Sequence, residues 1–140
     1  MGRHQLIKEI FQTVLLGNGI VYIKPTQNIT IEAEMARNIL ESCFADIDNP
    51  QNLGLILNMT RVAFVTEEAR EVLCDGLCVG RGISHLAFVS SNHLSNVIST
   101  LTMKECSSSQ IQMRMFNSAE NAVDWLQERE ISKQFLEAAC

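Results

Sequence analysis

The sequence predicts an α/β fold, with a mixed and mostly parallel sheet of about five strands, an N-terminal β-hairpin and about four helices. The first reason is a unit that recurs along the chain: strand-forming residues, then Ser, Thr or Asn, then an amphipathic helix. Its clearest copy is Ile111–Leu126. The second reason is the Gly-Asn-Gly sequence at residues 17–19, between the apolar runs Thr13–Leu16 and Ile20–Ile23. Asn-Gly supplies the positive φ angles of a type I′ hairpin turn.

The first helix is expected after Pro25, which ends the second strand of the hairpin. Thr30 is placed to cap this helix, because its hydroxyl can accept a hydrogen bond from a backbone N–H of the first turn. Glu32 and Glu34 fall in that turn, where the helix dipole favours negative charge. The apolar residues that share one face are Ala33, Ala36, Ile39, Leu40, Cys43, Phe44 and Ile47.

The second unit joins the strand Leu53–Met59 to a helix capped by Thr66. The strand is a nearly continuous apolar run, which is typical of a strand covered on both faces. Glu67 and Glu68 follow the cap and again favour the start of a helix. The stripe that we expect to be buried is Ala69, Val72, Leu73 and Leu77.

The third unit joins the strand His85–Ser90 to a helix that begins at Asn92 or Ser91. The centre of the strand is apolar, which predicts burial. Asn and Ser are both favourable N-cap residues. The apolar stripe, which we expect to pack on the sheet, is Leu94, Val97, Ile98 and Leu101.

The fourth unit starts with a strand in which Ile111, Met113 and Met115 alternate with polar residues, the period of a half-buried strand. Ser118 can cap the next helix, and Trp125 is expected to pack that helix onto the sheet. The apolar stripe is Ala119, Ala122, Val123 and Leu126. Crossovers of this kind make strands parallel, so the hairpin should add one antiparallel strand at an edge of the sheet.

Length and composition indicate one soluble, cytoplasmic domain of 140 residues, with its core over residues 10–128 and a tail over residues 129–140. The net charge of −5 disfavours a nucleic-acid partner, which requires clustered Lys and Arg. No apolar run approaches the roughly 18 residues of a membrane span. Lys8 and Glu9 also stand where a signal peptide would be apolar.

The five cysteines are odd in number and irregular in spacing, which indicates reduced thiols in the cytosol. Cys74 and Cys78 lie four residues apart and could bind a metal together with His85 or His93. Structural zinc sites usually have a closer cysteine pair and a second pair, which this sequence lacks. We therefore expect no metal site and no cofactor.

A group of polar residues, Ser90, Ser91, Asn92 and His93, follows the strand of the third unit. Ligands of open α/β sheets bind outside the carboxyl ends of the strands, so this group is the candidate site for a small molecule. A general acid or base at His93 would need a partner carboxylate and a nucleophile. The sequence has no recognisable set of this kind, so we expect helix capping by Asn92 and no enzymatic activity.

The last unit carries the most specific resemblance to a known family. The matching segments are Met115–Glu120 and Ala122–Leu126 with its Trp-Leu ending, supported by Gly19–Val21, Ala87–Val89 and Leu94–Asn96. With the order of the elements, these segments resemble the STAS fold, the domain of anti-sigma-factor antagonists (SpoIIAA-like proteins). More narrowly, the chain is similar to uncharacterised bacterial STAS-like proteins, in which a strand and a helix ending in Trp-Leu close the chain.

STAS antagonists carry an Asp-Ser pair at the start of the helix after the third strand, and phosphorylation of that Ser sets partner binding. Here Arg61–Val65 resembles the approach to the site, and Thr66 and Glu67 stand where the pair would be. Glu67 and Glu68 would repel a phosphate dianion. Thr66, Glu67 and Glu68 are therefore the candidate interaction residues at the switch position, with Thr66 expected to be a helix cap.

The resemblance and the missing catalytic set imply a non-enzymatic regulatory module that binds another protein. The alternative is a protein that binds a nucleotide or a lipid-like molecule through the loops at the carboxyl ends of the strands. We expect neither nucleic-acid binding nor membrane insertion. A homodimer is expected, because an exposed edge strand can pair with a second copy.

Overall fold

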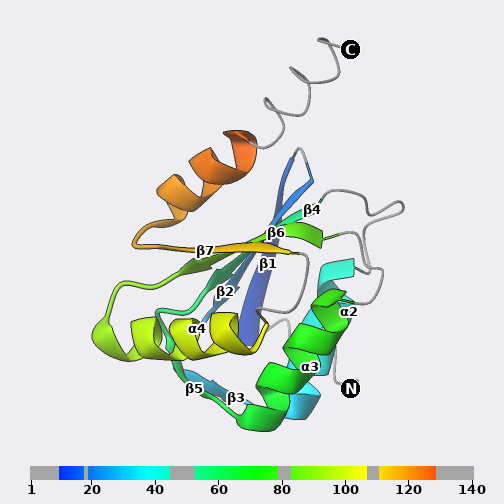
Figure 1. The fold of residues 1–140 in the computed structure, drawn as a ribbon, viewed down its shortest axis with the longest axis vertical. Helices are drawn as coiled ribbons and strands as arrows, with labels where there is room; N and C mark the ends of the chain where they lie inside the picture. Colours follow the sequence, from blue (N-terminus) through cyan, green and yellow to red (C-terminus); the bar gives the residue numbers. More distant parts are fainter. Residues whose placement is uncertain (1–9, 18, 45–52, 79–82, 107–110, 129–140) are drawn as a thin grey trace.

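The computed structural model describes residues 10–17, 19–44, 53–78, 83–106 and 111–128. Within this part of the chain, a five-stranded sheet, a two-stranded sheet and four helices form an α/β fold (Figure 1). The elements are β1 (Phe11–Gly17), β2 (Ile20–Pro25), β3 (Ile29–Ile31), α2 (Ala33–Phe44), β4 (Leu53–Asn58), β5 (Val62–Val65), α3 (Glu67–Cys78), β6 (Ile83–Val89), α4 (His93–Glu105), β7 (Gln112–Phe116) and the last helix (residues 119–128).

The large sheet has the strand order β1-β2-β4-β6-β7. β1 is antiparallel to β2, and every other neighbouring pair is parallel. This arrangement confirms the predicted mixed sheet with one antiparallel strand at an edge. The hairpin turn has Gly17 at φ 86° and Gly19 at φ 71°, a left-handed conformation that favours glycine. Asn18 lies outside the described residues.

A second, two-stranded sheet pairs β3 with β5 in parallel, and neither strand was predicted from the sequence. Thr30 lies inside β3, so the prediction that it caps the first helix is wrong. The burial pattern explains the strand, because Ile29 and Ile31 are buried and Thr30 between them is exposed. Such a short strand needs a partner, and β5 comes from a segment about thirty residues further along the chain.

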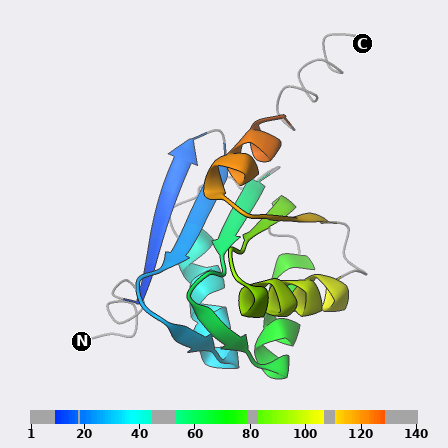
Figure 2. The ribbon, with the colours of Figure 1, turned by 90° about the vertical axis from the view of Figure 1, so that its left-hand side faces the viewer.

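The large sheet separates two hydrophobic cores (Figure 1, Figure 2). The larger core lies between the sheet and α2, α3 and α4. It contains predicted stripe residues of α2 and α3, which are Ala36, Ile39, Leu40, Ala69 and Leu73. Ala33 and Val72 are half-buried. Ile47 and the side chains of Cys43, Phe44 and Leu77 lie outside the described part of the chain.

The last helix covers the other face of the sheet, as predicted. Ala122 and Leu126 are fully buried there. Ser118 caps the helix, since its Oγ accepts a hydrogen bond from the backbone N–H of Asn121 at 3.2 Å. Trp125 packs the helix onto the sheet, with its ring centroid 5.3 Å from that of His85 in β6 and 5.5 Å from that of Phe116 in β7.

α4 departs from the prediction, because most of its apolar stripe faces outward. Leu94, Val97 and Leu101 are 54%, 43% and 42% exposed, and only Ile98 of the predicted stripe is buried. The other buried residues of the helix are Ser95, Ser99 and Thr102. The first turn explains this orientation: Ser95 Oγ lies 2.6 Å from Ser90 Oγ, so Ser95 is held against the end of β6. Leu94 precedes Ser95 in the helix, so its side chain points about 100° away from the sheet-facing direction of Ser95.

A disulfide joins Cys74 in α3 to Cys106 at the end of α4, so the prediction that all cysteines are reduced is wrong for these two. The residues are 32 positions apart in sequence, and their Cα atoms are 5.1 Å apart. This distance lies within the usual range for a disulfide, and only the packing of α3 beside α4 creates it. The bond also occupies Cys74, which removes the metal site considered for Cys74 and Cys78.

Candidate functional site

The predicted ligand group at the end of β6 is a hydrogen-bonded junction between two loops. Asn92 caps α4, as predicted, because its Oδ1 accepts a hydrogen bond from the backbone N–H of Ser95 at 2.8 Å. Its Nδ2 donates to the carbonyl oxygen of Thr60, in the loop after β4, at 3.1 Å. Ser91 Oγ donates to Thr60 Oγ1 at 3.4 Å. These bonds hold the start of α4 against the β4–β5 loop.

Ser90 belongs to the interior of the same junction. It is 3% exposed, and its Oγ lies 2.6 Å both from Asn96 Oδ1 and from Ser95 Oγ. Ser95 Oγ also lies 3.2 Å from the carbonyl oxygen of Asn92. His93 is exposed at the first position of α4. The side chains of Ser90, Ser91 and Asn92 are therefore directed at protein groups, and the structure assigns them a structural role whether or not a ligand binds nearby.

The residues that were predicted to stand at the switch position lie at the start of α3. Thr66 Oγ1 accepts a hydrogen bond from the backbone N–H of Ala69 at 3.1 Å, which confirms the predicted helix cap. The backbone N–H of Thr66 donates to the carbonyl oxygen of Ile31 at 3.0 Å, which ties this turn to β3. Glu67 and Glu68 are exposed in the first turn of α3.

An open depression lies where α2 and α3 begin. The residues that line it are Glu32, Ala33, Glu34, Arg37, Thr66, Glu67 and Glu68. Four carboxylates face one guanidinium, so the depression disfavours phosphate and other anions. Among the described residues, no three His, Cys, Asp or Glu side chains are grouped so that they could hold a metal ion.

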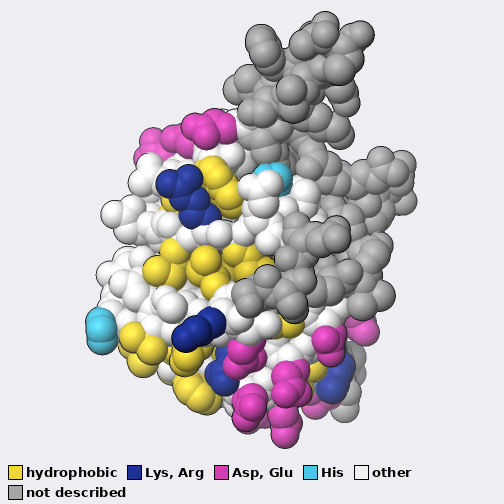
Figure 3. Space-filling view, viewed as in Figure 1, with side chains coloured by type: hydrophobic (Ala, Val, Ile, Leu, Met, Phe, Trp, Pro, Cys, Tyr) yellow, Lys and Arg dark blue, Asp and Glu magenta, His cyan; other side chains and the backbone are white. Residues whose placement is uncertain are grey.

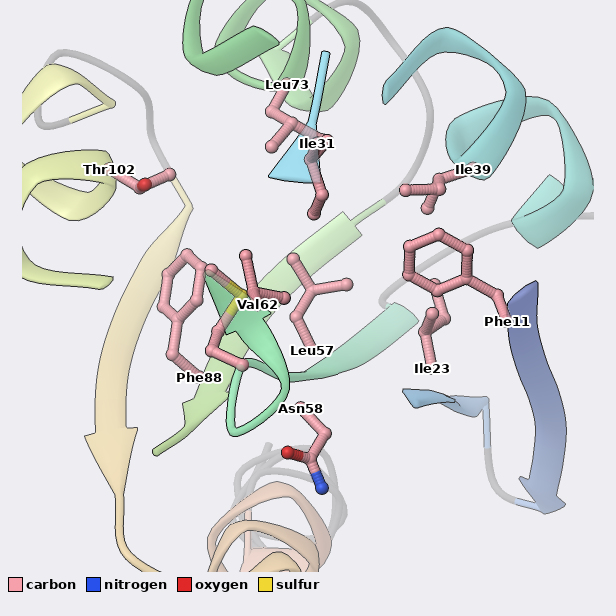
Figure 4. Close-up of a pocket in the computed structure, with 11 residues that line it drawn as sticks. Phe11, Ile23, Ile31, Ile39, Leu57, Asn58, Val62, Leu73, Phe88 and Thr102 are labelled. Atoms are coloured by element: carbon pink, nitrogen blue, oxygen red, sulfur yellow. The ribbon is translucent and has the colours of Figure 1, made fainter. Parts of the chain in front are cut away.

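A buried apolar cavity lies between the large sheet and α2 and α3 (Figure 4). About 20 Å³ is open to the centre of a water-sized sphere. Its lining residues come from the strands β1 to β6, from the loop after β4 and from α2, α3 and α4, and they are apolar except for Asn58 and Thr102. The Asn58 side chain points away from the cavity, and its Nδ2 donates a hydrogen bond to Tyr22 Oη at 2.8 Å. The space is enough for about one water molecule and far too small for a nucleotide.

The largest departure from the predicted surface is an apolar face on α4. We call it the α4 face and define it as Leu94, Val97 and Leu101 of α4, Phe64 of β5 and Met115 of β7. Phe64 and Met115 are 47% and 36% exposed. α4 packs beside β5, and Thr100 Oγ1 lies 3.8 Å from Met115 Sδ on β7. Figure 3 shows hydrophobic side chains gathered over this side of the molecule.

The charges next to the α4 face are positive. Lys104 of α4 and Arg114 of β7 are exposed. Glu105 is the one carboxylate within α4, β5 and β7, and it forms an ion pair with Arg70, with 2.6 Å between Oε1 and Nε. Acidic side chains gather instead beside the starts of α2 and α3 and at the opposite end of the molecule (Figure 3).

The sequence contained a signal for the α4 face that was assigned to the wrong side of the helix. Leu94, Val97 and Leu101 have helical spacing, which predicts a buried stripe. Ser95, Ser99 and Thr102 have the same kind of spacing on a neighbouring stripe. Three small polar residues at these intervals are an alternative inward face, because small side chains allow a helix to lie close to a sheet.

Comparisons with known proteins agree with this fold. The structure resembles the crystal structure of an uncharacterized protein from the DUF3478 family with a SpoIIAA-like fold, from Shewanella loihica PV-4. The TM-score is 0.55 at 17% sequence identity, and the match covers 83% of this chain and 91% of that chain. The expected SpoIIAA-like fold is therefore confirmed.

Sequence comparison identifies the family but no activity. Within the described residues, none of the helices has the length and apolar character needed to cross a membrane. The comparison with curated proteins gives no match. The family described as "Domain of unknown function (DUF7793)" matches residues 14–130, and the chain belongs to this family.

Proposed function

We propose that this chain is a non-enzymatic regulatory module that binds another protein through the α4 face. The observation that supports the proposal is the outward orientation of Leu94, Val97 and Leu101, each more than 40% exposed on one side of a helix. Phe64 and Met115 extend the same surface onto β5 and β7. Exposed apolar side chains that gather on one face of a protein are candidates for an interaction site.

The partner segment is an apolar one flanked by carboxylates. Lys104 and Arg114 supply positive charge beside the α4 face, while the one carboxylate of these elements, Glu105, is already paired with Arg70. Complementary charge at the rim of an interface steers the partner and excludes segments of the wrong sign. A second copy docked through the same face would bring Lys104 and Arg114 close to their own equivalents, which argues against self-association there.

The test compares wild type with a variant that carries Leu94→Gln, Val97→Gln and Leu101→Gln. Both proteins are used to capture partners from a cell extract, the captured proteins are purified, and the Kd of each is measured directly. Full burial of an exposed leucine is worth about 1.5–3 kcal/mol. Because Leu94 and Leu101 are 54% and 42% exposed, docking can bury only about half of each side chain, so each lost leucine should weaken binding about three- to tenfold. The binding segment of the partner is then located by cross-linking.

The matched control carries Glu41→Gln and Glu71→Gln, which place the same residue at exposed positions of α2 and α3. This control should bind as wild type does. Equal affinity of the triple variant and wild type for every captured protein would contradict the proposed site. A partner segment that is basic rather than acidic, or an affinity unaffected by Lys104→Glu and Arg114→Glu, would contradict the proposed chemistry of the partner.

Binding of a small molecule by Ser90, Ser91, Asn92 and His93 has weaker support. The side chains of the first three are hydrogen-bonded to Thr60 and to residues in the first turn of α4. A ligand would have to compete with these bonds or use His93 and backbone groups. Native mass spectrometry of the purified protein tests this alternative, since a nucleotide or lipid-like ligand would appear as a discrete added mass.

A further inference from the structure

We propose that the Cys74–Cys106 disulfide is a redox-controlled lock that keeps α4 turned with its apolar face outward. The proposal concerns the regulation of the α4 face and rests on the proposed function for its biological meaning. The lock itself is a property of α4, so it can be tested without a partner. Three features of the helix support it: how its ends are held, what it buries, and what it exposes.

The two ends of α4 are held by different means. At the start, the cap of Asn92 and the contact between Ser90 and Ser95 fix the first turn. At the end, Cys106 is bonded to Cys74 of α3. The neighbouring Arg70–Glu105 ion pair is partly exposed, with 34% of the Glu105 side chain accessible, so solvent screens it. The disulfide is therefore the strong tie at this end.

Between its ends, α4 buries a face that is poorly suited to the core. Ser95, Ser99 and Thr102 are 0%, 0% and 1% exposed, and Ile98 is the one large apolar residue buried with them. Ser99 Oγ is buried without a hydrogen-bond partner in the described structure. A buried polar atom without a partner destabilises the arrangement that contains it.

The exposed apolar stripe of α4 would gain more from burial than the small polar stripe that is buried. Adjacent residues of an α-helix are separated by about 100° around its axis. A turn of about that size would bring Leu94 and Leu101 toward the core and move Ser99 to solvent. Cys106 would turn with the helix and could no longer face Cys74. The same turn would separate Ser95 from Ser90, so the disulfide and the contacts of the first turn together select the outward arrangement, and reduction removes the covalent one of these ties.

The chemical step is thiol–disulfide exchange with a dithiol. One thiolate of the dithiol attacks the sulfur of Cys74, which is partly exposed, whereas Cys106 is 1% exposed. The S–S bond breaks, and Cys106 leaves as a thiolate that takes up a proton. The second thiol of the reagent then displaces Cys74, which also gains a proton. Two electrons pass to the protein, and the dithiol becomes a cyclic disulfide.

The experiment measures the exposure of α4 in the oxidised and the reduced protein. Dithiothreitol is the reductant, and a mass increase of about 2 Da reports the reduction. Fluorescence of the dye ANS reports accessible apolar surface, and hydrogen exchange followed by mass spectrometry reports the protection of α4. Reduction should lower ANS binding by about twofold or more, with circular dichroism unchanged. Unchanged or increased ANS binding after reduction would overturn the lock.

Two kinds of variant separate the lock from a general loss of stability. A protein with Cys74→Ser and Cys106→Ser should have the ANS fluorescence of reduced wild type, and dithiothreitol should not change it. The ANS fluorescence of Cys140→Ser should fall on reduction as that of wild type does. Ser99→Ala removes the unpartnered hydroxyl and so favours the outward arrangement. Its ANS signal should fall less on reduction than that of wild type, and an equal fall would contradict the turning of the helix.

The outcomes also distinguish the lock from the proposed function. If reduction hides the α4 face but partner binding is independent of that face, the lock stands and the proposed function fails. If partners bind the α4 face equally well in both redox states, the proposed function stands and the lock fails.

Discussion

Thr66 Oγ1 accepts a hydrogen bond from the backbone N–H of Ala69, 3.1 Å away, in the two-residue segment Thr66-Glu67 that was predicted to replace the Asp-Ser pair of STAS antagonists. The hydroxyl that could receive a phosphate is thus in use as a helix cap. Glu67 and Glu68 beside it, with Glu32 and Glu34 across the depression, make this end of the molecule unfavourable for added negative charge.

Replacement of the Thr66 cap should reduce stability. Thr66→Ala should lower the free energy of unfolding by about 0.5–2 kcal/mol, because one N–H of the first turn of α3 loses its acceptor. Thr66→Ser keeps the hydroxyl and should have a small effect. Urea denaturation measures both. Unchanged stability of Thr66→Ala, together with phosphorylation of Thr66 in the native host and altered partner binding, would restore the phosphoswitch.

Replacement of Asn92 should destabilise the start of α4. Asn92→Ala removes both the cap to Ser95 and the bond to the carbonyl of Thr60, so the cost should reach about 1–2 kcal/mol. His93→Ala, at the neighbouring exposed position, is the control and should be nearly neutral. Thermal unfolding followed by circular dichroism gives the comparison. Equal melting temperatures for the Asn92 variant and wild type would show that the junction does not stabilise the fold.

Truncation of Leu126 should be among the most damaging changes on its face of the sheet. The side chain is fully buried, and the last helix is the helix that covers this face in the described structure. Leu126→Ala should cost about 2–5 kcal/mol through lost burial and the cavity that remains. Gln127→Ala, exposed on the same helix, should cost less than about 0.5 kcal/mol. Chemical denaturation measures the free energy of unfolding of both variants, and equal losses for the two would contradict this prediction.

Self-association is expected through the edge strand β1. Among the described residues, no strand pairs with its outer edge, and Leu15 and Leu16 are 56% and 45% exposed near the hairpin turn. Light scattering at micromolar concentration should give twice the chain mass of 15.7 kDa. Leu15→Lys with Leu16→Lys should shift the protein to the monomer mass. A wild-type mass of 15.7 kDa would contradict the dimer.

The strand–helix units were readable from the sequence because each depends on neighbouring residues. Alternating or continuous apolar residues predicted β4, β6 and β7, and Ser or Thr or Asn at the right place predicted the caps by Thr66, Asn92 and Ser118. The two hairpin glycines, Gly17 and Gly19, were readable for the same reason. The cap hydrogen bonds join residues three positions apart, and the pattern of apolar residues that marks a strand is visible within that strand alone.

The tertiary structure decided the features that join distant parts of the chain. β3 and β5 are each too short to be recognised from the sequence. They pair with each other although α2 and β4 lie between them in the chain. Cys74 and Cys106 meet because α3 packs beside α4, and no spacing in the sequence encodes that distance.

The candidate site was the least predictable part. Ser90, Ser91, Asn92 and Thr66 were selected from sequence, and the structure shows each of them in use as a structural hydrogen-bonding group. The α4 face was missed, although its leucines were noticed, because hydrophobic periodicity shows that a helix has an apolar stripe but not which way the helix is turned. That rotation is set by the contact between Ser90 and Ser95 and by the disulfide at the far end, which exist only once the sheet and helices have assembled.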